Sequence, residues 1–439
     1  MIVLALPART RGEVQAFSEN DARQAQTILG DMQRAVVEFY YPNDRIGKEF
    51  DARCAAADKA LTRVHSHSEA FAVIADALAS PDPRIRFIPP LRNSRVDYSW
   101  QWTLIGSAAY VTQVDKDGEA RKQALEVGDK ILSYEGVTIG RDNYEAIHYA
   151  FEVLAPRPGL RVQVESPGKE PRWLAIPSTI RPQRRLNSSG TRSSFWMAFE
   201  LSESDRRHRD EFLELKQHLH FSGSIAVWRP YELRREEGYV ADGLKELKPS
   251  SALILDLRGM DVHRYEPVIR LLDGVFAEKF TAGTVKRGNQ ALTDARLNVG
   301  GSASAFHGIV LVLVDSGTGG YAEVLARVIQ QKRRGVILGD FTMGRVLEAR
   351  QVGQTRGSLS SFAMASVVVP TGELVMGDGV AVDGKGVAPD LLLRPTPADL
   401  AGNRDVVLAK ALAMLKQKVT AEDARKIVHL PSEDDDDNE

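Results

Sequence analysis

The sequence predicts a mixed α/β protein with a largely parallel central sheet in its C-terminal half. Two observations favour this fold class. The run Gly308 to Val314 is too short for a membrane span and rich in Val and Ile, which is typical of a strand buried on both faces. Around it, segments with strand and helix patterns alternate, as in parallel sheets with crossover helices. The segments are Ser224–Trp228, a helix over Val240–Leu247, Ala252–Leu257, a helix over Val268–Phe276, the run itself, a helix from Tyr321, and Gly335–Gly339.

A glycine-rich turn joins the buried strand to the helix that follows it. Residues 312 to 326 read VLVDSGTGGYAEVLA, and apolar residues recur at helical spacing from Val324 to Ile329. A turn of this kind ahead of a helix N-terminus directs backbone N–H groups at something negative. The turn is therefore expected to hold a phosphate or the oxyanion of an acyl-transfer reaction.

The N-terminal half carries two other patterns. Residues 18 to 80 have helical spacing after a capping sequence at Ser18, and prolines at positions 81, 83, 89 and 90 end that region. From about Val96 the period changes to two, with strands expected over Tyr110–Val114 and Lys130–Tyr134 and a helix over Asn143–Leu154. A polar, basic stretch from Arg181 to Arg192 is the expected linker.

Composition excludes several classes of function. The 439 residues have a formal net charge of -2, which gives no general electrostatic reason to expect nucleic acid as a partner. The single cysteine excludes an intrachain disulfide and a cysteine-based zinc cluster, and the nine histidines form no metal set, so neither metal nor cofactor is expected. No apolar run reaches the roughly 20 residues that a membrane-spanning helix needs.

The first residues, MIVLALPARTRG, have the character of a signal-peptide apolar region without the basic segment that should precede it. We interpret residues 1–17 as a leader remnant or a disordered N-terminus. A periplasmic or secreted location is the expectation, with an ordinary apolar N-terminus and a cytoplasmic location as the alternative.

Several stretches, in order, resemble the C-terminal-processing or tail-specific serine proteases. ALEVGDKILSYEGVTI is similar to the PDZ motif of that family, and SSALILDLRG at 250–259 to its strand ending in DLR. VLVDSGTGGYAEVLA stands where the family has its nucleophile loop, DFTMGRV at 340–346 where it has TFGKG, and GKGVAPD at 384–390 where it has GKGIxPD. The resemblance spans roughly residues 20 to 420. It implies a crotonase-like α/β core, a PDZ-like β-rich domain and an N-terminal helical region.

The family's Ser-Lys dyad is missing when its motifs are laid on this sequence. The family's nucleophilic serine falls at Gly320 and its lysine base at Arg345. Glycine has no nucleophilic atom, and a protonated guanidinium accepts no proton. Val262 and His263 occupy the oxyanion loop, where the family has glycine, and an auxiliary aspartate falls at Gln331. The resemblance therefore implies a pseudoprotease that binds polypeptide segments or a partner protein.

Two alternatives remain open. Ser316 or Thr318 is a candidate for a relocated nucleophile in an active serine endopeptidase, although both hydroxyls are also suited to capping the turn. Gly317, Gly319 and Ala322 also fit GxGxxA, with Asp340 twenty residues after Gly320, as in a dinucleotide-binding protein. For Arg345 the expectation is a structural pairing with Glu323 or a backbone carbonyl, and the alternative is capture of a peptide carboxylate.

The PDZ-like segment is the expected binding device. A PDZ domain takes an extended C-terminus as an added strand, and by position its carboxylate loop is Ser99-Trp100-Gln101-Trp102. The family's glycine is absent from this loop. The expected division of the chain is a helical domain over 18–92, a PDZ-like domain over 93–180, a linker over 181–192, a protease-like α/β core over 193–400, a C-terminal helix over 401–430 and an acidic disordered tail over 431–439.

Overall fold

The computed structural model describes residues 17–42, 46–90, 94–182, 219–230, 233, 237–287, 294–356 and 363–428. The expected leader, the linker beyond Pro182 and the acidic tail lie outside these residues. By its internal contacts the chain divides into two units. Unit 1 comprises residues 1–91, 153–155 and 350–369, and unit 2 comprises the rest. Each unit is described by itself.

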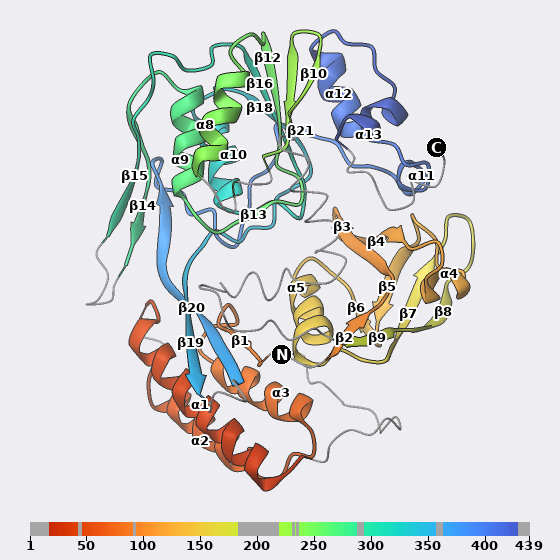
Figure 1. The fold of residues 1–439 in the computed structure, drawn as a ribbon, viewed down its shortest axis with the longest axis vertical. Coiled ribbons are helices and arrows are strands. Elements are labelled where there is room, and N and C mark those ends of the chain that lie inside the picture. The colour runs from red at the N-terminus through yellow and green to blue at the C-terminus, as the bar shows by residue number, and fades with distance from the viewer. Residues whose placement is uncertain are drawn as a thin grey trace. The chain divides into compact units, whose positions relative to one another are not determined.

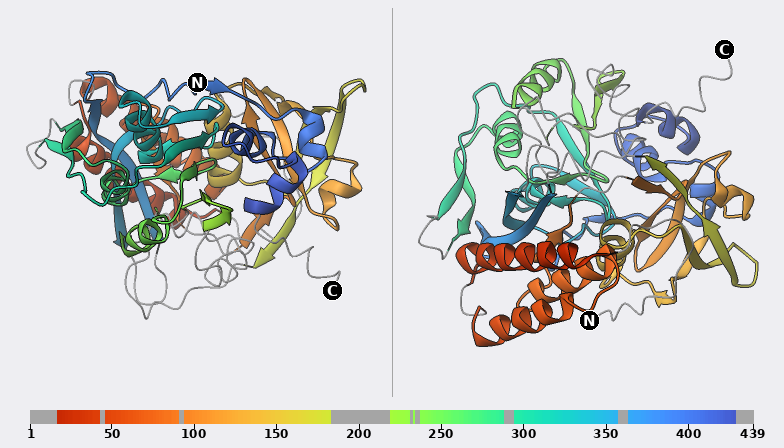
Figure 2. Two further views of the ribbon diagram at one scale, coloured as in Figure 1. Left: turned by 90° about the horizontal axis from the view of Figure 1, so that it is seen from above. Right: turned by 60° about the horizontal axis from the view of Figure 1, so that its bottom comes forward.

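Unit 1 is built on three helices that pack side by side (Figure 2). They are α1 (Glu19–Phe39), α2 (Lys48–Leu61) and α3 (His67–Leu78). The predicted cap at Ser18 is present, because Ser18 and Asp21 exchange side-chain and backbone hydrogen bonds in a capping box. Strand β1 (Arg86–Ile88) follows and pairs with the first part of β20 (Ala363–Met376), where Phe87 faces Val367.

The β-rich segment of unit 2 follows the period-two pattern of the sequence. Its main sheet has the order β3-β4-β5-β7-β8, with β6 beside β5, and every pairing is antiparallel. The bounds are β2 (Ser94–Asp97), β3 (Trp100–Ile105), β4 (Ala108–Val114), α4 (Glu119–Lys122), β5 (Lys130–Tyr134), β6 (Val137–Thr138), α5 (Tyr144–His148), a π-helix (Tyr149–Leu154), β7 (Gly159–Glu165), β8 (Arg172–Pro177) and β9 (Thr179–Pro182). Arg181 and Pro182, expected in a linker, lie in β9 and pair with β2.

The predicted parallel sheet is present in unit 2. Its order is β10-β11-β12-β16-β18-β21, with all pairs parallel except β10 with β11. The bounds are β10 (Leu219–Ser222), β11 (Ile225–Trp228), β12 (Ala252–Asp256), β16 (Ile309–Val314), β18 (Val336–Gly339) and β21 (Leu391–Leu392). The alternation of strand and helix predicted this arrangement correctly.

Helices cover both faces of the parallel sheet, because alternate strand residues point to opposite sides (Figure 1). On one face Val310 and Val312 pack in the same cluster as α8 (Glu237–Glu246), α9 (Glu266–Val275) and α10 (Tyr321–Gln331). On the other face Leu311 and Leu313 pack with α12 (Val406–Met414) and α13 (Ala421–Val428). Short elements complete the segment: β13 (Asp261–Val262), β17 (Gly319–Gly320) and α11 (Pro397–Ala401).

A further antiparallel group of unit 2 contains β14 (Phe280–Lys286), β15 (Ala295–Val299) and the last part of β20. Strand β19 (Leu347–Arg356) pairs with β20. Val285 on β14 faces Leu374 on β20. Among the described residues, no helix is long and apolar enough to cross a bilayer.

The DLR motif after β12 is anchored by a buried charge network. Arg258 donates to both carboxylate oxygens of Asp256 and to both of Asp405. Burial alone would raise the pKa of Asp256, but Arg258 lowers it below its usual value. The network fixes the loop that follows β12, and this loop borders the candidate site.

Candidate degenerate protease site

The backbone at Gly320 leaves no room for a side chain. Gly320 ends β17 directly before α10, with φ 59 and ψ -136, a conformation that only glycine adopts readily. A Cβ atom built on Gly320 would lie closer to the carbonyl oxygen of Val262 than van der Waals contact allows. A serine therefore does not fit at this position in the present conformation.

The loop before Gly320 is held against its neighbours through its backbone. Asp261 and Val262, in β13, pair in parallel with Gly319 and Gly320, in β17. Val262 is fully buried here. His263 follows it and is exposed, with Nε2 3.6 Å from a carboxylate oxygen of Asp261.

Three consecutive N–H groups of this loop already have acceptors within the chain. The N–H of Thr318 donates to the carbonyl of Asp315 at 3.0 Å, that of Gly319 to Met260 at 2.9 Å, and that of Gly320 to Arg345 at 3.0 Å. An oxyanion hole needs donors aimed at a developing charge. These three groups are not available for that purpose.

Within the turn, the carboxyl group of Asp315 accepts hydrogen bonds from the surrounding backbone, and the phosphate or reaction oxyanion expected there stays a prediction. Oδ1 of Asp315 accepts from the N–H of Gly259 at 2.8 Å and from the N–H of Gly317 at 3.0 Å, and the hydroxyl oxygen of Thr318 lies 3.2 Å away. Burial raises the pKa of Asp315 above its usual value. Sequence reasoning missed Asp315, although an aspartate at the start of a glycine-rich turn commonly bonds to the backbone that follows it.

Ser316 and Thr318 both lie within structural hydrogen bonds. The Ser316 hydroxyl donates to the carbonyl of Leu104. The Thr318 hydroxyl donates to the carbonyl of Leu257 at 2.9 Å and accepts from the N–H of Asp315 at 3.0 Å. Among the described residues, neither hydroxyl is hydrogen-bonded to a lysine or a histidine, the groups that would serve as a general base.

Arg345 is engaged by two carboxylates, and neither belongs to Glu323. Its guanidinium bonds to Asp261 and, at 2.7 Å, to Glu145 of α5. The expected side-chain pairing with Glu323 was wrong, because Glu323 instead accepts the backbone N–H of Arg345 at 2.8 Å. Although burial alone would lower it, the two carboxylates raise the pKa of Arg345, so that this residue stays protonated and cannot act as a base.

Glu323 holds the turn that carries Arg345. It is fully buried in the first turn of α10 and accepts from the hydroxyl of Thr342, from the N–H of Gly344 at 2.7 Å and from that of Arg345. Burial raises the pKa of Glu323 to about 7, while the three donors oppose that shift. The carboxyl is therefore poised to titrate near neutral pH.

The other expected positions are dispersed. Gln331 is the last residue of α10. Asp340, the acidic group of the dinucleotide alternative, accepts from the N–H of Gly106 at 2.6 Å and pairs with Arg394 at 2.9 Å. No group of His, Cys, Asp and Glu suited to a metal ion is found in the part of the chain that the structure describes.

The expected carboxylate loop is a strand. Trp100, Gln101 and Trp102 lie in β3 and pair with β4, where Trp100 faces Val114, so they do not form an open loop of N–H groups. Ser99 precedes the strand with φ 57. Both tryptophans are buried, and the ring of Trp102 stacks on that of His148 with 4.4 Å between their centroids. Burial of these large rings gives the segment its strand conformation.

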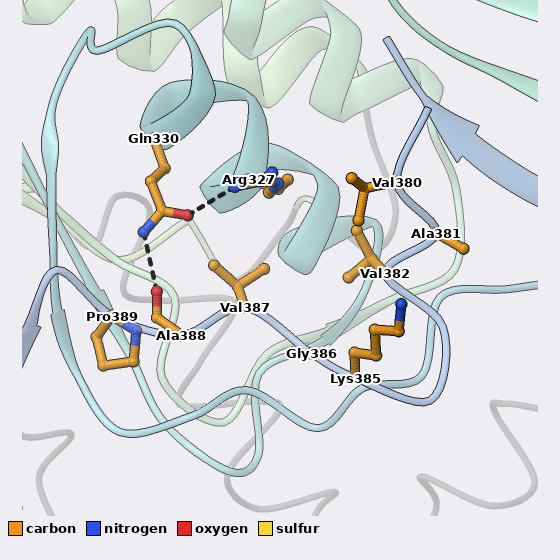
Figure 3. A pocket seen from close by; sticks show the side chains of 10 residues that line it. All are labelled: Arg327, Gln330, Val380, Ala381, Val382, Lys385, Gly386, Val387, Ala388 and Pro389. Carbon is orange, nitrogen blue, oxygen red and sulfur yellow. Dashed lines mark hydrogen bonds between the residues drawn. The ribbon is translucent and has the colours of Figure 1, made fainter. Parts of the chain in front are cut away.

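A pocket of about 380 Å³ lies beside the GKGVAPD motif (Figure 3). Gln330 of α10 closes one end, since its side chain accepts from Arg327 at 3.1 Å and donates to the carbonyl of Ala388 at 2.9 Å. Lys385 lies toward the other end, near Val382. These bonds hold the motif against α10, and within the described residues no hydrogen bond joins Lys385 to Ser316 or Thr318.

Comparison with known proteins assigns the core. Residues 223–393 match Peptidase family S41. This segment of the chain is therefore similar to the tail-specific proteases. The matched range runs from β11 to β21 and includes Gly320 and Arg345.

Individual relatives agree with this assignment. A chloroplastic C-terminal processing peptidase of Tetradesmus obliquus is 35% identical over 95 residues, which cover 21% of this chain and 19% of that protein. The matched segment thus spans about a fifth of the relative's length. Mature CPAF, in a crystal structure, matches with a TM-score of 0.60 at 12% identity, covering 87% of this chain and 94% of that chain. Its complex with lactacystin gives 0.59 at 11% identity, covering 87% and 95%. The structural likeness concerns the fold.

Proposed function

We propose that this chain is a pseudoprotease, a catalytically inactive protein that binds polypeptide segments. The single observation that carries the proposal is the backbone at Gly320, the family's nucleophile position. It bears no nucleophile, and the carbonyl of Val262 occupies the space that a serine side chain needs. The arginine at the base position and the internally bonded N–H groups of residues 318 to 320 support the same conclusion.

The geometry gives no support to an enzyme with a relocated nucleophile. The hydroxyls of Ser316 and Thr318 each donate to a backbone carbonyl, as capping and turn residues do. A dinucleotide site is equally unsupported. Its pyrophosphate would need the N–H groups of the turn, which bond instead to Asp315, Met260 and Arg345.

A fluorophosphonate probe tests the inactive state, since such probes label activated serines. We expect no labelling of the native chain under conditions in which trypsin is labelled fully. Labelling that disappears in the Ser316→Ala variant would overturn the proposal and establish the relocated nucleophile.

For the binding activity we propose that residues 93–180 form a PDZ-like domain whose receptive edge is β3. This strand is the outermost of its sheet among the described residues. Trp102 of β3 faces Val111 of β4. The N–H of Val111 donates to the carbonyl of Asp129 and its C=O accepts from the N–H of Gly128, so both groups of Val111 point away from β3. The pair is therefore not hydrogen-bonded, and the N–H and C=O of Trp102 point away from β4. An added peptide strand would meet these groups.

Peptide binding is tested with a fluorescein-labelled peptide, Gly-Ser-Thr-Thr-Val, that has a free C-terminal carboxylate. We expect saturable binding, weakened at least about tenfold when the backbone nitrogen of its third residue is methylated, because strand addition depends on main-chain bonds. Equal binding of the methylated peptide would contradict strand addition at β3.

The remaining assignments are also proposals. They are the crotonase-like character of the core over 193–400, the linker over 181–192 with its boundary now displaced beyond β9, and a periplasmic or secreted location. The S41 match over residues 223–393 supports the first of these.

A further inference from the structure

Two residues of the degenerate site bond directly to the two elements that border the proposed peptide edge. Ser316, in the nucleophile loop, donates to the carbonyl of Leu104 in β3. Arg345, at the base position, pairs with Glu145 in α5 at 2.7 Å. In the β-rich segment these two elements are themselves joined by the stacking of Trp102 on His148.

The turn that carries Arg345 makes further contacts with the same helix region. Arg141, just before α5, donates to the carbonyls of Thr342 and Phe341, each at 2.9 Å. Glu323 fixes this turn, because its carboxylate accepts the backbone N–H groups of Gly344 and Arg345. A continuous chain of bonds therefore runs from the first turn of α10 to α5.

The end of β3 is held in a similar way. Beyond Leu104, the N–H of Gly106 donates to the carboxylate of Asp340 at 2.6 Å, and Arg394 pairs with the same carboxylate at 2.9 Å. Of the outward-facing groups of β3, the carbonyl of Leu104 is thus already used, so an added strand would pair near Trp102 rather than along the whole edge.

We propose that Ser316 and Arg345 are positioning residues that fix β3 and α5 at one spacing and so set the affinity for peptide. The inference rests on the proposed function. A peptide strand that binds between β3 and α5 binds more tightly when these two elements already hold their bound positions, because less ordering accompanies binding. Ser316, in the nucleophile loop, and Arg345, at the base position, would then have a binding role without contacting the peptide.

The test compares Arg345→Met, Glu145→Gln and their combination with the native chain. A matched control is Arg327→Met, because Arg327 and Asp378 form a pair at 2.6 Å with side chains 26% and 25% exposed, against 25% and 26% for Arg345 and Glu145. The first measurement is hydrogen exchange of the α5 and β3 amides without peptide. The second is the affinity for the labelled Gly-Ser-Thr-Thr-Val peptide.

We expect faster exchange in α5 and β3 and at least about fivefold weaker peptide binding in both single variants. The double variant should bind the peptide no more weakly than Arg345→Met alone, because both substitutions remove the same ion pair. Arg327→Met should change neither the exchange rates nor the peptide affinity. Glu145→Gln keeps the pair between Arg345 and Asp261, so it guards against misfolding at Asp261.

The two proposals fail in different ways. Unchanged exchange in α5 and β3 in both single variants overturns the positioning role whether or not peptide binds. Absence of binding to the native chain overturns the peptide-binding function, while the exchange measurement still decides whether Arg345 and Glu145 position α5. Faster exchange with unchanged peptide affinity overturns the link between spacing and affinity.

Discussion

The carbonyl oxygen of Val262 occupies the place where a Cβ atom on Gly320 would lie. The two residues are partners in the parallel pair of β13 and β17, so the close approach is part of the local sheet. The local sheet thus leaves no room for a side chain at position 320.

Restoring the serine should destabilise the chain and leave it inactive. Gly320→Ser combines a positive φ with a clash against backbone, and we expect a loss of at least about 2 kcal/mol of stability. The measurement is the midpoint of urea unfolding. Gly223→Ser is the matched control. Gly223 also has a positive φ, 62, but a Cβ atom there would make only an ordinary contact, 3.6 Å from Nε2 of Gln417. Equal losses in the two variants would show that Val262 does not restrict position 320.

The buried hydroxyl of Thr318 should stabilise the folded chain. Thr318→Val removes the acceptor of the Asp315 N–H inside the chain, and an unsatisfied buried donor costs about 1–3 kcal/mol. Thermal unfolding of Thr318→Val, compared with that of Thr281→Val at an exposed site in β14, measures this cost. A Thr318→Val protein as stable as the control would contradict the structural role of the hydroxyl.

Glu323 should make stability depend on pH between about 4.5 and 7. Because burial raises its folded pKa to about 7 from 4.5, the folded state retains a proton that the unfolded state has lost in this range. Stability from this group is complete below pH 4.5 and decreases as the pH rises through 7, by about 3 kcal/mol for the full shift.

The comparison of the native chain with Glu323→Gln isolates that effect, with exposed Glu246→Gln as the control. The stability advantage of the native chain over Glu323→Gln should narrow as the pH rises from 4.5 to 7.5, measured by urea unfolding at each pH. An advantage that widens with pH would mean that the three donors, rather than burial, determine the charge of Glu323.

The fold was largely predictable because its signals are local. The strand at Lys130–Tyr134 has its predicted bounds, and the alternation after residue 224 gave the parallel sheet, since period and length distinguish buried strands from amphipathic helices. The strand at Trp100–Ile105 was expected to begin as a loop. Its conformation depends on burial of Trp100 and Trp102, which alignment with a family motif does not reveal.

The site was predictable only in part. Gly320 and Arg345 followed from motif spacing, whereas the phosphate or oxyanion expected at the glycine-rich turn stays a prediction. The hydrogen bonds of Asp315 depend on the detailed backbone path of one turn. The pairs of Arg345 with Asp261 and Glu145 join residues separated in sequence by 84 and by 200 positions. Sequence periodicity carries no such information.

Hydrolysis of an unfolded polypeptide tests the central claim most directly. The native chain is incubated with reduced, carboxymethylated lactalbumin, and the products are followed by intact-mass spectrometry beside Ser316→Ala and Thr318→Ala variants purified in the same way. We expect the substrate mass to be unchanged in all three samples. Fragments that form with the native chain and are absent with either variant would contradict it.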